Sequence, residues 1–144
     1  MLNPKIKFKK LSKTAKIPCY AHEGDAGMDL FSAEKKTLAP NERYTFKLGL
    51  AMELDEGYAF IIKDKSSIPY KYGVTTLGGV IEYTYRGDIG VILLNTSNEP
   101  VTFEIGQKIA QAIIIPIATA QIEETDELSK TIRGEGGFGS TGER

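Results

Sequence analysis

Short segments of alternating apolar and polar residues recur along the chain. Ile6 and Phe8 alternate with lysines, and Tyr44, Phe46, Leu48 and Leu50 occupy every second position. Further segments rich in aromatic and β-branched residues cover 58–62, 89–94, 101–105 and 108–115. Alternation with a period of two favours strands over helices, and the spacing of these segments is typical of a β-sandwich or β-barrel. The pattern predicts an all-β fold.

No long segment of the chain has apolar residues at helical spacing, and the only helix candidate is a short one at residues 66–72. Ser66 or Ser67 can cap its N-terminus, and Pro69 is tolerated in its first turn. The preceding Lys65, the two hydroxyls and the helix N–H groups together suit an anion. The alternative interpretation is a plain helix cap with solvated charges.

The C-terminal segment differs from the rest of the chain in composition. From Thr131 onward it contains five glycines between positions 134 and 142, with Arg133 and a single aromatic residue, Phe138. Glycine N–H groups and an arginine guanidinium can donate hydrogen bonds to phosphates, and a flat aromatic ring can stack on a base. The segment is therefore predicted to bind a nucleotide. The alternative is a disordered glycine-rich tail. We expect a β body over residues 1–122 and a mobile arm over residues 123–144.

Three other segments contain candidate binding residues. Residues 78–88 suggest a hairpin, in which Glu82 and Tyr85 can serve one site only if a turn or bulge separates them, because positions i and i+3 of a strand face opposite ways. The alternative is an exposed hairpin with polar residues at its tip. Asp29 suggests a turn carboxylate, and Gln111 suggests a buried hydrogen-bonding side chain. Each is more often structural than functional.

Charge and composition limit the functional classes. The chain has 144 residues, 18 Lys and Arg against 19 Asp and Glu, and one Cys. This size predicts one domain, and a net charge of −1 gives no general attraction to nucleic acid. One cysteine forms no internal disulfide, and the most apolar stretch, 109–120, is too short to span a bilayer. We expect a soluble cytoplasmic protein without membrane or nucleic-acid partners.

Five segments, in order, resemble the five motifs of the trimeric dUTP diphosphatases (dUTPases). These segments are Ala26–Leu30, Lys65–Ser67, Gly79–Glu82 with Tyr85–Gly87, Gly106 with Ile109–Gln111, and Arg133–Gly142. The last is the most specific, and the match covers most of the chain. The resemblance implies a β-barrel of jelly-roll type and a homotrimer with three active sites at subunit interfaces, each closed by a C-terminal arm. It also implies hydrolysis of dUTP to dUMP and pyrophosphate, with Mg²⁺ carried on the triphosphate.

The resemblance assigns a role to each motif. Glu82, Ser66 and Asp29 would be catalytic: Glu82 activates the water, Ser66 holds phosphate oxygens, and Asp29 acts through Mg²⁺-bound water rather than as a direct ligand. The hairpin from Gly79 would bind uracil through its main chain, and Tyr85 would pack under the deoxyribose. The full set of implied substrate-binding residues is Lys65, Ser66, Ser67, Gly79, Val80, Ile81, Glu82, Tyr85, Gln111, Arg133, Phe138, Gly139, Ser140 and Thr141.

The chain departs from the family pattern at three places. Glu82 stands where the family usually has Asp, Lys65 where it has Arg, and Gln107-Lys108 where it has Asp-Arg. The longer side chain of Glu82 can misplace the carboxylate and lower the rate of hydrolysis. The other two departures replace arginine by lysine and can weaken the binding of phosphate. The alternatives are a trimeric nucleotide-binding protein without catalysis and a dCTP deaminase or bifunctional relative. The resemblance implies that deamination needs a glutamate shortly before an Asn on the strand after the hairpin. Deamination is disfavoured because residues 91–94, before Asn95, are wholly apolar.

Overall fold

The computed structural model describes residues 3–140 and 142, and these form eleven strands and one helix. The elements are β1 (Ile6–Lys10), β2 (Met28–Phe31), β3 (Lys36–Leu38), β4 (Arg43–Lys47), β5 (Leu50–Leu54), β6 (Tyr58–Lys63), α1 (Ser67–Tyr72), β7 (Val74–Leu77), β8 (Val80–Glu82), β9 (Gly90–Asn95), β10 (Val101–Phe103) and β11 (Lys108–Pro116). In this described part of the chain, no helix is long and apolar enough to cross a membrane.

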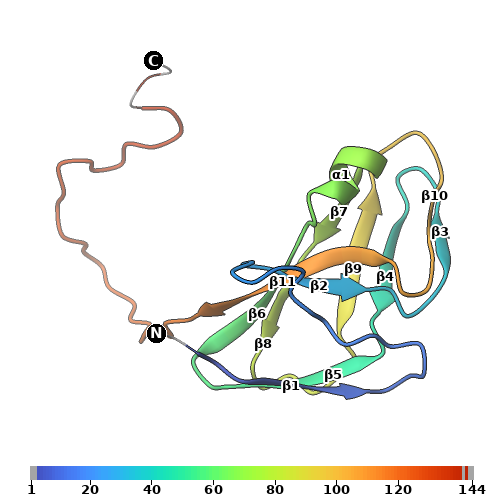
Figure 1. The fold of residues 1–144 in the computed structure, drawn as a ribbon. Helices are drawn as coiled ribbons and strands as arrows, with labels where there is room; N and C mark the ends of the chain where they lie inside the picture. The colour runs from blue at the N-terminus through green and yellow to red at the C-terminus, as the bar shows by residue number, and fades with distance from the viewer. Residues whose placement is uncertain (1–2, 141, 143–144) are drawn as a thin grey trace.

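The strands form four antiparallel sheets around one hydrophobic core (Figure 1). Their strand orders are β1-β5, β10-β3, β2-β11-β6-β8 and β4-β9-β7. Phe46, Phe60 and Phe103 are fully buried at the centre of the core, where Phe46 and Phe103 meet edge to face at 5.6 Å. The all-β, jelly-roll-like fold with a short helix is as predicted.

Two strand predictions need correction. The predicted strand over Tyr44–Leu50 is divided between β4 and β5. Gly49 separates them with φ +64°, and a Cβ there would lie 2.3 Å from the Ser12 hydroxyl oxygen. Asp29, predicted in a turn, lies in β2, whose four residues are all buried. A strand covered on both faces shows no alternation, which is why the sequence pattern missed it.

The helix forms where the sequence predicts it. Pro69 occupies the first turn, and Gly73 ends the helix with φ +62° while its N–H donates to the Pro69 carbonyl oxygen at 2.9 Å. Ser66 is the N-cap residue, but its hydroxyl forms no capping hydrogen bond with any described residue. The exposed hydroxyl is therefore not used to stabilise the helix.

The predicted hairpin over residues 78–88 is not a pair of hydrogen-bonded strands. β7 pairs with β9, whereas β8 pairs with β6 in a different sheet. Gly78 and Gly79, with φ +64° and +106°, turn the chain from one sheet to the other. A Cβ at Gly79 would lie 2.7 Å from the Ile62 carbonyl oxygen, so the close approach of β8 to β6 requires glycine.

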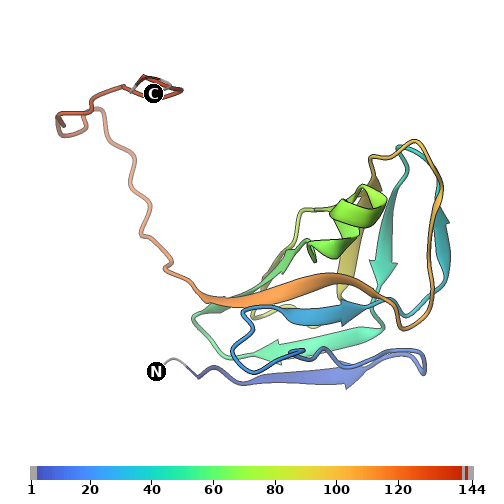
Figure 2. The same cartoon turned by 45° about the horizontal axis from the view of Figure 1, so that its top comes forward.

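The chain after β11 leaves the sheets. Over residues 117–140 it contains neither a strand nor a helix, and it extends away from the sheets in both views (Figures 1 and 2). Ile117 is still partly buried, and its N–H donates to the Gly57 carbonyl oxygen at 2.9 Å, but the large apolar side chains that follow it, Ile122, Leu128, Ile132 and Phe138, are all exposed, at 87% or more. Beyond Ile117 this segment therefore contributes nothing to the core of the chain that carries it.

Candidate active site

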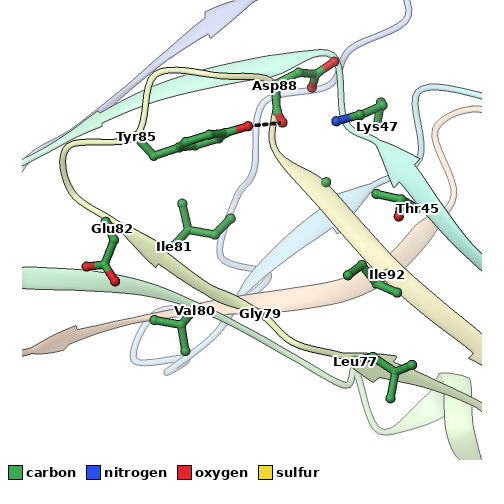
Figure 3. Close-up of a pocket in the computed structure, with 11 residues that line it drawn as sticks. Thr45, Lys47, Leu77, Gly79, Val80, Ile81, Glu82, Tyr85, Asp88 and Ile92 are labelled. Carbon is green, nitrogen blue, oxygen red and sulfur yellow. Dashed lines mark hydrogen bonds between the residues drawn. The ribbon is translucent and has the colours of Figure 1, made fainter.

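A pocket of about 360 Å³ lies between β8 and the start of β9 (Figure 3). Its lining residues are Thr45, Lys47, Leu77, Gly79, Val80, Ile81, Glu82, Tyr85, Asp88, Gly90 and Ile92. β8 is an edge strand of its sheet, and the pairing of β7 with β9 extends only from Val74↔Asn95 to Leu77↔Ile92. Backbone N–H and C=O groups on these facing edges are available to a planar polar ligand.

Tyr85 is fixed across this pocket by its own turn. Its N–H donates to the Glu82 carbonyl oxygen at 3.0 Å, and its hydroxyl donates to the Asp88 carbonyl oxygen at 3.1 Å. A Cβ at Gly87 would lie 2.3 Å from the Tyr85 hydroxyl oxygen, so the tyrosine occupies the space that glycine leaves. Glu82 and Tyr85 both line the pocket, although the Glu82 carboxylate points to the side of β8 away from the Tyr85 ring (Figure 3).

Glu82 ends β8 at the mouth of the pocket. Strand alternation directs Val80 and Glu82 to one side of β8 and Ile81 to the other, towards Tyr85 (Figure 3). The side chain is exposed, and Figure 3 shows its carboxylate without a hydrogen bond to the other residues drawn. An exposed carboxylate at a pocket mouth is available to bind and polarise a water molecule.

A second polar group lies at the opposite end of β6. The Asp29 side chain is only 3% exposed, and it contacts the ammonium groups of Lys65 at 2.7 Å and Lys108 at 2.6 Å. We call these three residues the Asp29 cluster. Burial on its own would raise the pKa of Asp29, but the two lysines outweigh it and hold the pKa below its usual value. The carboxylate is therefore ionised at neutral pH.

Gln111 and Asp64 fix the loop that carries Lys65 and Ser66. The Gln111 amide donates to the Asp64 carbonyl oxygen at 2.7 Å, and its own oxygen occupies the space above Gly27, where a Cβ would lie within 2.1 Å. The Asp64 carboxylate accepts the Thr75 hydroxyl at 2.8 Å and the Thr76 N–H at 2.6 Å. Burial raises the pKa of Asp64, and these hydrogen bonds reverse the shift.

The predicted catalytic residues do not all meet within one chain. Glu82 pairs with Ala59 near the start of β6, whereas Lys63, at its end, pairs with Gln111, which in turn pairs with Asp29. Four residues along a strand span about 13 Å. Glu82 and the Asp29 cluster are therefore too far apart to contact one phosphate group.

The predicted residues of the C-terminal segment also lie away from both groups. Arg133 donates from Nε to the Gly136 carbonyl oxygen at 2.9 Å, and Ser140 donates its N–H to the Gly137 carbonyl oxygen at 3.0 Å. Phe138 is fully exposed, and Gly139 has φ +87°. Thr141 lies outside the described residues. The predicted site residues therefore fall into three separate groups: Glu82 with Tyr85, the Asp29 cluster, and the C-terminal segment. A single chain does not bring these groups together.

The comparisons with known proteins identify the family. The sequence model of the family described as dUTPase matches residues 13–142. The deoxyuridine 5'-triphosphate nucleotidohydrolase of Clostridium novyi (strain NT) is 46% identical over 140 residues, which cover 96% of this chain and 99% of the relative. The chain belongs to the dUTPase family. The same name is given to a relative from Nautilia profundicola, also 46% identical over 140 residues, with 96% and 99% coverage.

Solved dUTPases share the fold. The dUTPase of Staphylococcus bacteriophage 80alpha with dUPNHPP has a TM-score of 0.87 and 31% identity, covering 96% of this chain and 98% of that one. A mutant dUTPase from phage phi11 of S. aureus, described as revealing the coordination of a structural Mg(II) ion, has a TM-score of 0.82 and 25% identity, with 88% and 99% coverage. The family, the jelly-roll-like fold and the enzyme class that the sequence predicted are therefore confirmed.

Sequence reasoning did not find several residues of the pocket beside β8 or of the Asp29 cluster. Thr45, Lys47 and Asp88 line it, and Lys108 holds Asp29, but none of these contacts was predicted. Thr45 and Lys47 are exposed positions of an ordinary alternating strand, so no local signal distinguishes them. Lys108 lies inside the fourth motif, so its place in that motif could have marked it as a candidate site residue.

Proposed function

We propose that this chain hydrolyses dUTP to dUMP and pyrophosphate. The pocket between the facing edges of β8 and β9 supports this proposal most strongly, because Tyr85 lies across it and Glu82 lies at its mouth in a chain of the dUTPase family. Its volume of about 360 Å³ suits one nucleoside.

In this proposal the backbone selects the base. N–H and C=O groups of the β8 edge bind the polar edge of uracil. The amino group of cytosine would leave a buried polar group unpaired, at a cost of about 1–3 kcal/mol. The narrow pocket excludes the 5-methyl group of thymine. Tyr85 packs against the deoxyribose and leaves no room for a 2′-hydroxyl.

Glu82 then activates the water. Its carboxylate accepts a proton from a water molecule whose oxygen attacks the α-phosphorus. The bond from that phosphorus to the bridging oxygen breaks, and pyrophosphate leaves. General-base assistance of this kind contributes roughly 10²–10⁴ in rate.

Lys65, Ser66 and Gln111 bind the phosphates. Ser66 keeps an exposed hydroxyl, and the first N–H groups of α1, including that of Ser67, lie beside it. Gln111 commits one amide N–H to Asp64 and keeps the other for phosphate oxygens. These donors stabilise the charge that develops on the departing pyrophosphate.

We further propose a homotrimer with its active sites between subunits. The separation of about 13 Å along β6 between Glu82 and the Asp29 cluster supports a site in which different subunits supply these two groups. Residues 1–122 form the body, and residues 123–144 form an arm that closes a site. There Arg133, Gly139, Ser140 and Thr141 bind the terminal phosphates and Phe138 covers the base.

Mg²⁺ enters this proposal as the companion of the triphosphate. Among residues 3–140 and 142, no group of three or more His, Cys, Asp or Glu could hold a metal ion. Both Asp29 oxygens contact lysine ammonium groups, Oδ1 at 2.7 Å and Oδ2 at 2.6 Å, so Asp29 would reach the ion only through a water bound to Mg²⁺ and not as a direct ligand. When bound, Mg²⁺ would neutralise phosphate charge. We also propose a cytoplasmic location, in line with a chain that has a single cysteine.

Pyrophosphate release from dUTP, dTTP, dCTP and UTP with Mg²⁺ tests the function directly. We expect rapid release from dUTP and little from the other three nucleotides. Tight binding of dUTP without turnover would instead support the non-catalytic nucleotide-binding alternative. Release of ammonia from dCTP would support the deaminase alternative.

A further inference from the structure

Lys108 lies beside Asp29 because of an irregularity in β11. Lys108 pairs with Phe31 and Ala110 pairs with Leu30, so two steps along β11 correspond to one step along β2. Ile109 is the extra residue, and its side chain is fully buried. In a regular ladder Ile109 would oppose Phe31, and Lys108 would point to the other face of the sheet. The bulge re-aims Lys108 towards Asp29.

The charges of the Asp29 cluster do not cancel. Two ammonium groups contact one carboxylate, which leaves a net charge of +1. Lys65 and Lys108 are 29% and 44% exposed, whereas Asp29 is 3% exposed. The anion is therefore buried beneath two cations that reach the surface, next to the exposed hydroxyl of Ser66.

Lys65 has two possible partners, the buried carboxylate of Asp29 and a phosphate group of the substrate. A lysine that leaves a buried carboxylate to bind phosphate would leave that carboxylate unpaired, which is strongly unfavourable. Here each carboxylate oxygen has its own ammonium group, Lys65 at Oδ1 and Lys108 at Oδ2. Lys65 can therefore turn towards a phosphate while Lys108 keeps Asp29 neutralised.

We propose that Lys108 is a positioning residue of the phosphate site, which neutralises the buried Asp29 so that the positive charge of Lys65 remains available to the triphosphate. The proposal rests on the function proposed above and concerns this chain's own lysine pair. In this proposal the bulge at Ile109 supports phosphate binding, because it directs Lys108 towards Asp29.

Calorimetric titration of the Lys108→Met variant tests this role. The two probes are dUPNHPP, which carries the triphosphate, and deoxyuridine, which carries none. We expect Lys108→Met to bind dUPNHPP ~10-fold more weakly than the wild type, and deoxyuridine equally well. Lys108→Arg should restore most of the affinity because it restores a cation beside Oδ2.

Lys35→Met provides the matched control. Lys35 forms an exposed ion pair with Glu104 at 2.8 Å, so this variant also loses one paired lysine, but away from the Asp29 cluster. It should leave both affinities unchanged. Thermal unfolding of each variant should confirm that the protein used in the titrations is folded.

The outcomes separate this proposal from the proposed function. Unchanged dUPNHPP affinity in folded Lys108→Met would overturn the role of Lys108 alone. Equal weakening for both probes would show a structural role and would also overturn it. Wild-type protein that binds neither probe would overturn the proposed function together with this inference.

Discussion

The candidate site residues at the two ends of β6 differ in how firmly contacts within one chain hold them. At the Lys63 end, Asp29, Gln111 and Asp64 are tied to their neighbours by ion pairs and hydrogen bonds of 2.6–2.8 Å. At the Ala59 end, Glu82 is exposed and Figure 3 draws no hydrogen bond to its carboxylate.

This difference indicates how the proposed work is divided. Charges that bind phosphates gain from being fixed in advance, because a preorganised group needs no rearrangement when the ligand arrives. A general base instead needs a water and a reacting phosphorus beside it. In the proposed trimer, other subunits contribute to bringing these together.

Removal of the Glu82 carboxylate should have the largest effect. We expect Glu82→Ala to lower kcat by roughly 10²–10⁴ because no base remains for the water, while binding of dUPNHPP changes little. Pyrophosphate release and calorimetry measure the two quantities. Glu82→Asp then reports on spacing: a faster variant would show that the longer side chain is suboptimal, and a slower one that the pocket is adapted to it. Equal turnover by wild type and Glu82→Ala would contradict the assigned role.

Removal of the arm should come next. A protein ending at residue 132 loses Arg133 and Phe138, and we expect a loss of ~10²–10³ in turnover because the donors to the terminal phosphates are missing. The melting temperature should hardly change, since Phe138, the large apolar residue that is lost, is fully exposed. Full activity in the truncated protein would show that the arm takes no part in the site.

Mixing two inactive variants should show whether Glu82 and Lys65 of one active site come from different subunits. If different subunits supply Glu82 and Lys65 to one site, co-refolded Glu82→Ala and Lys65→Met chains regain up to about a quarter of wild-type activity, the share of sites with both groups intact in random trimers. Each variant refolded alone is the control. If both groups came from one subunit, mixing would restore nothing.

The smallest predicted effect concerns stability and pH. We expect Asp29→Asn to lower the free energy of unfolding by ~1.5–3 kcal/mol at pH 7, since charge-assisted bonds to two lysines are lost. The two lysines hold the pKa of Asp29 in the folded protein below its ordinary value in an unfolded chain, so its contribution is complete above that ordinary value and disappears as the pH falls through the lower folded pKa.

Urea unfolding at pH 7, 4 and 3 measures this dependence. The difference between wild type and Asp29→Asn should shrink towards pH 3. Glu104→Gln, which removes the exposed partner of Lys35, serves as the control and should change stability by no more than about 1 kcal/mol. A wild-type advantage that grows on acidification would contradict the assigned pKa direction.

Local chemistry allowed the sequence to determine much of this protein. Alternating residues predicted most of the core strands, and Ser66, Ser67 and Pro69 predicted the place of α1, although the Ser66 hydroxyl does not cap it. The five motifs predicted the family, because their residue types suit a nucleoside triphosphate and their order along the chain matches the order in the family. Glu82 and Tyr85 needed only one local turn to share a pocket.

Only the tertiary structure decided the rest. β2 is buried on both faces, so Asp29 looked like part of a turn until its neighbours β11 and the β6–α1 loop were in place. The bulge at Ile109 cannot be read from the order of residues, since it exists only as a mismatch between two strands. The pairing of β8 with β6 and of β7 with β9 opens the pocket and separates Glu82 from the Asp29 cluster. Such features depend on which distant segments pair, and pairing is settled by burial of the whole core.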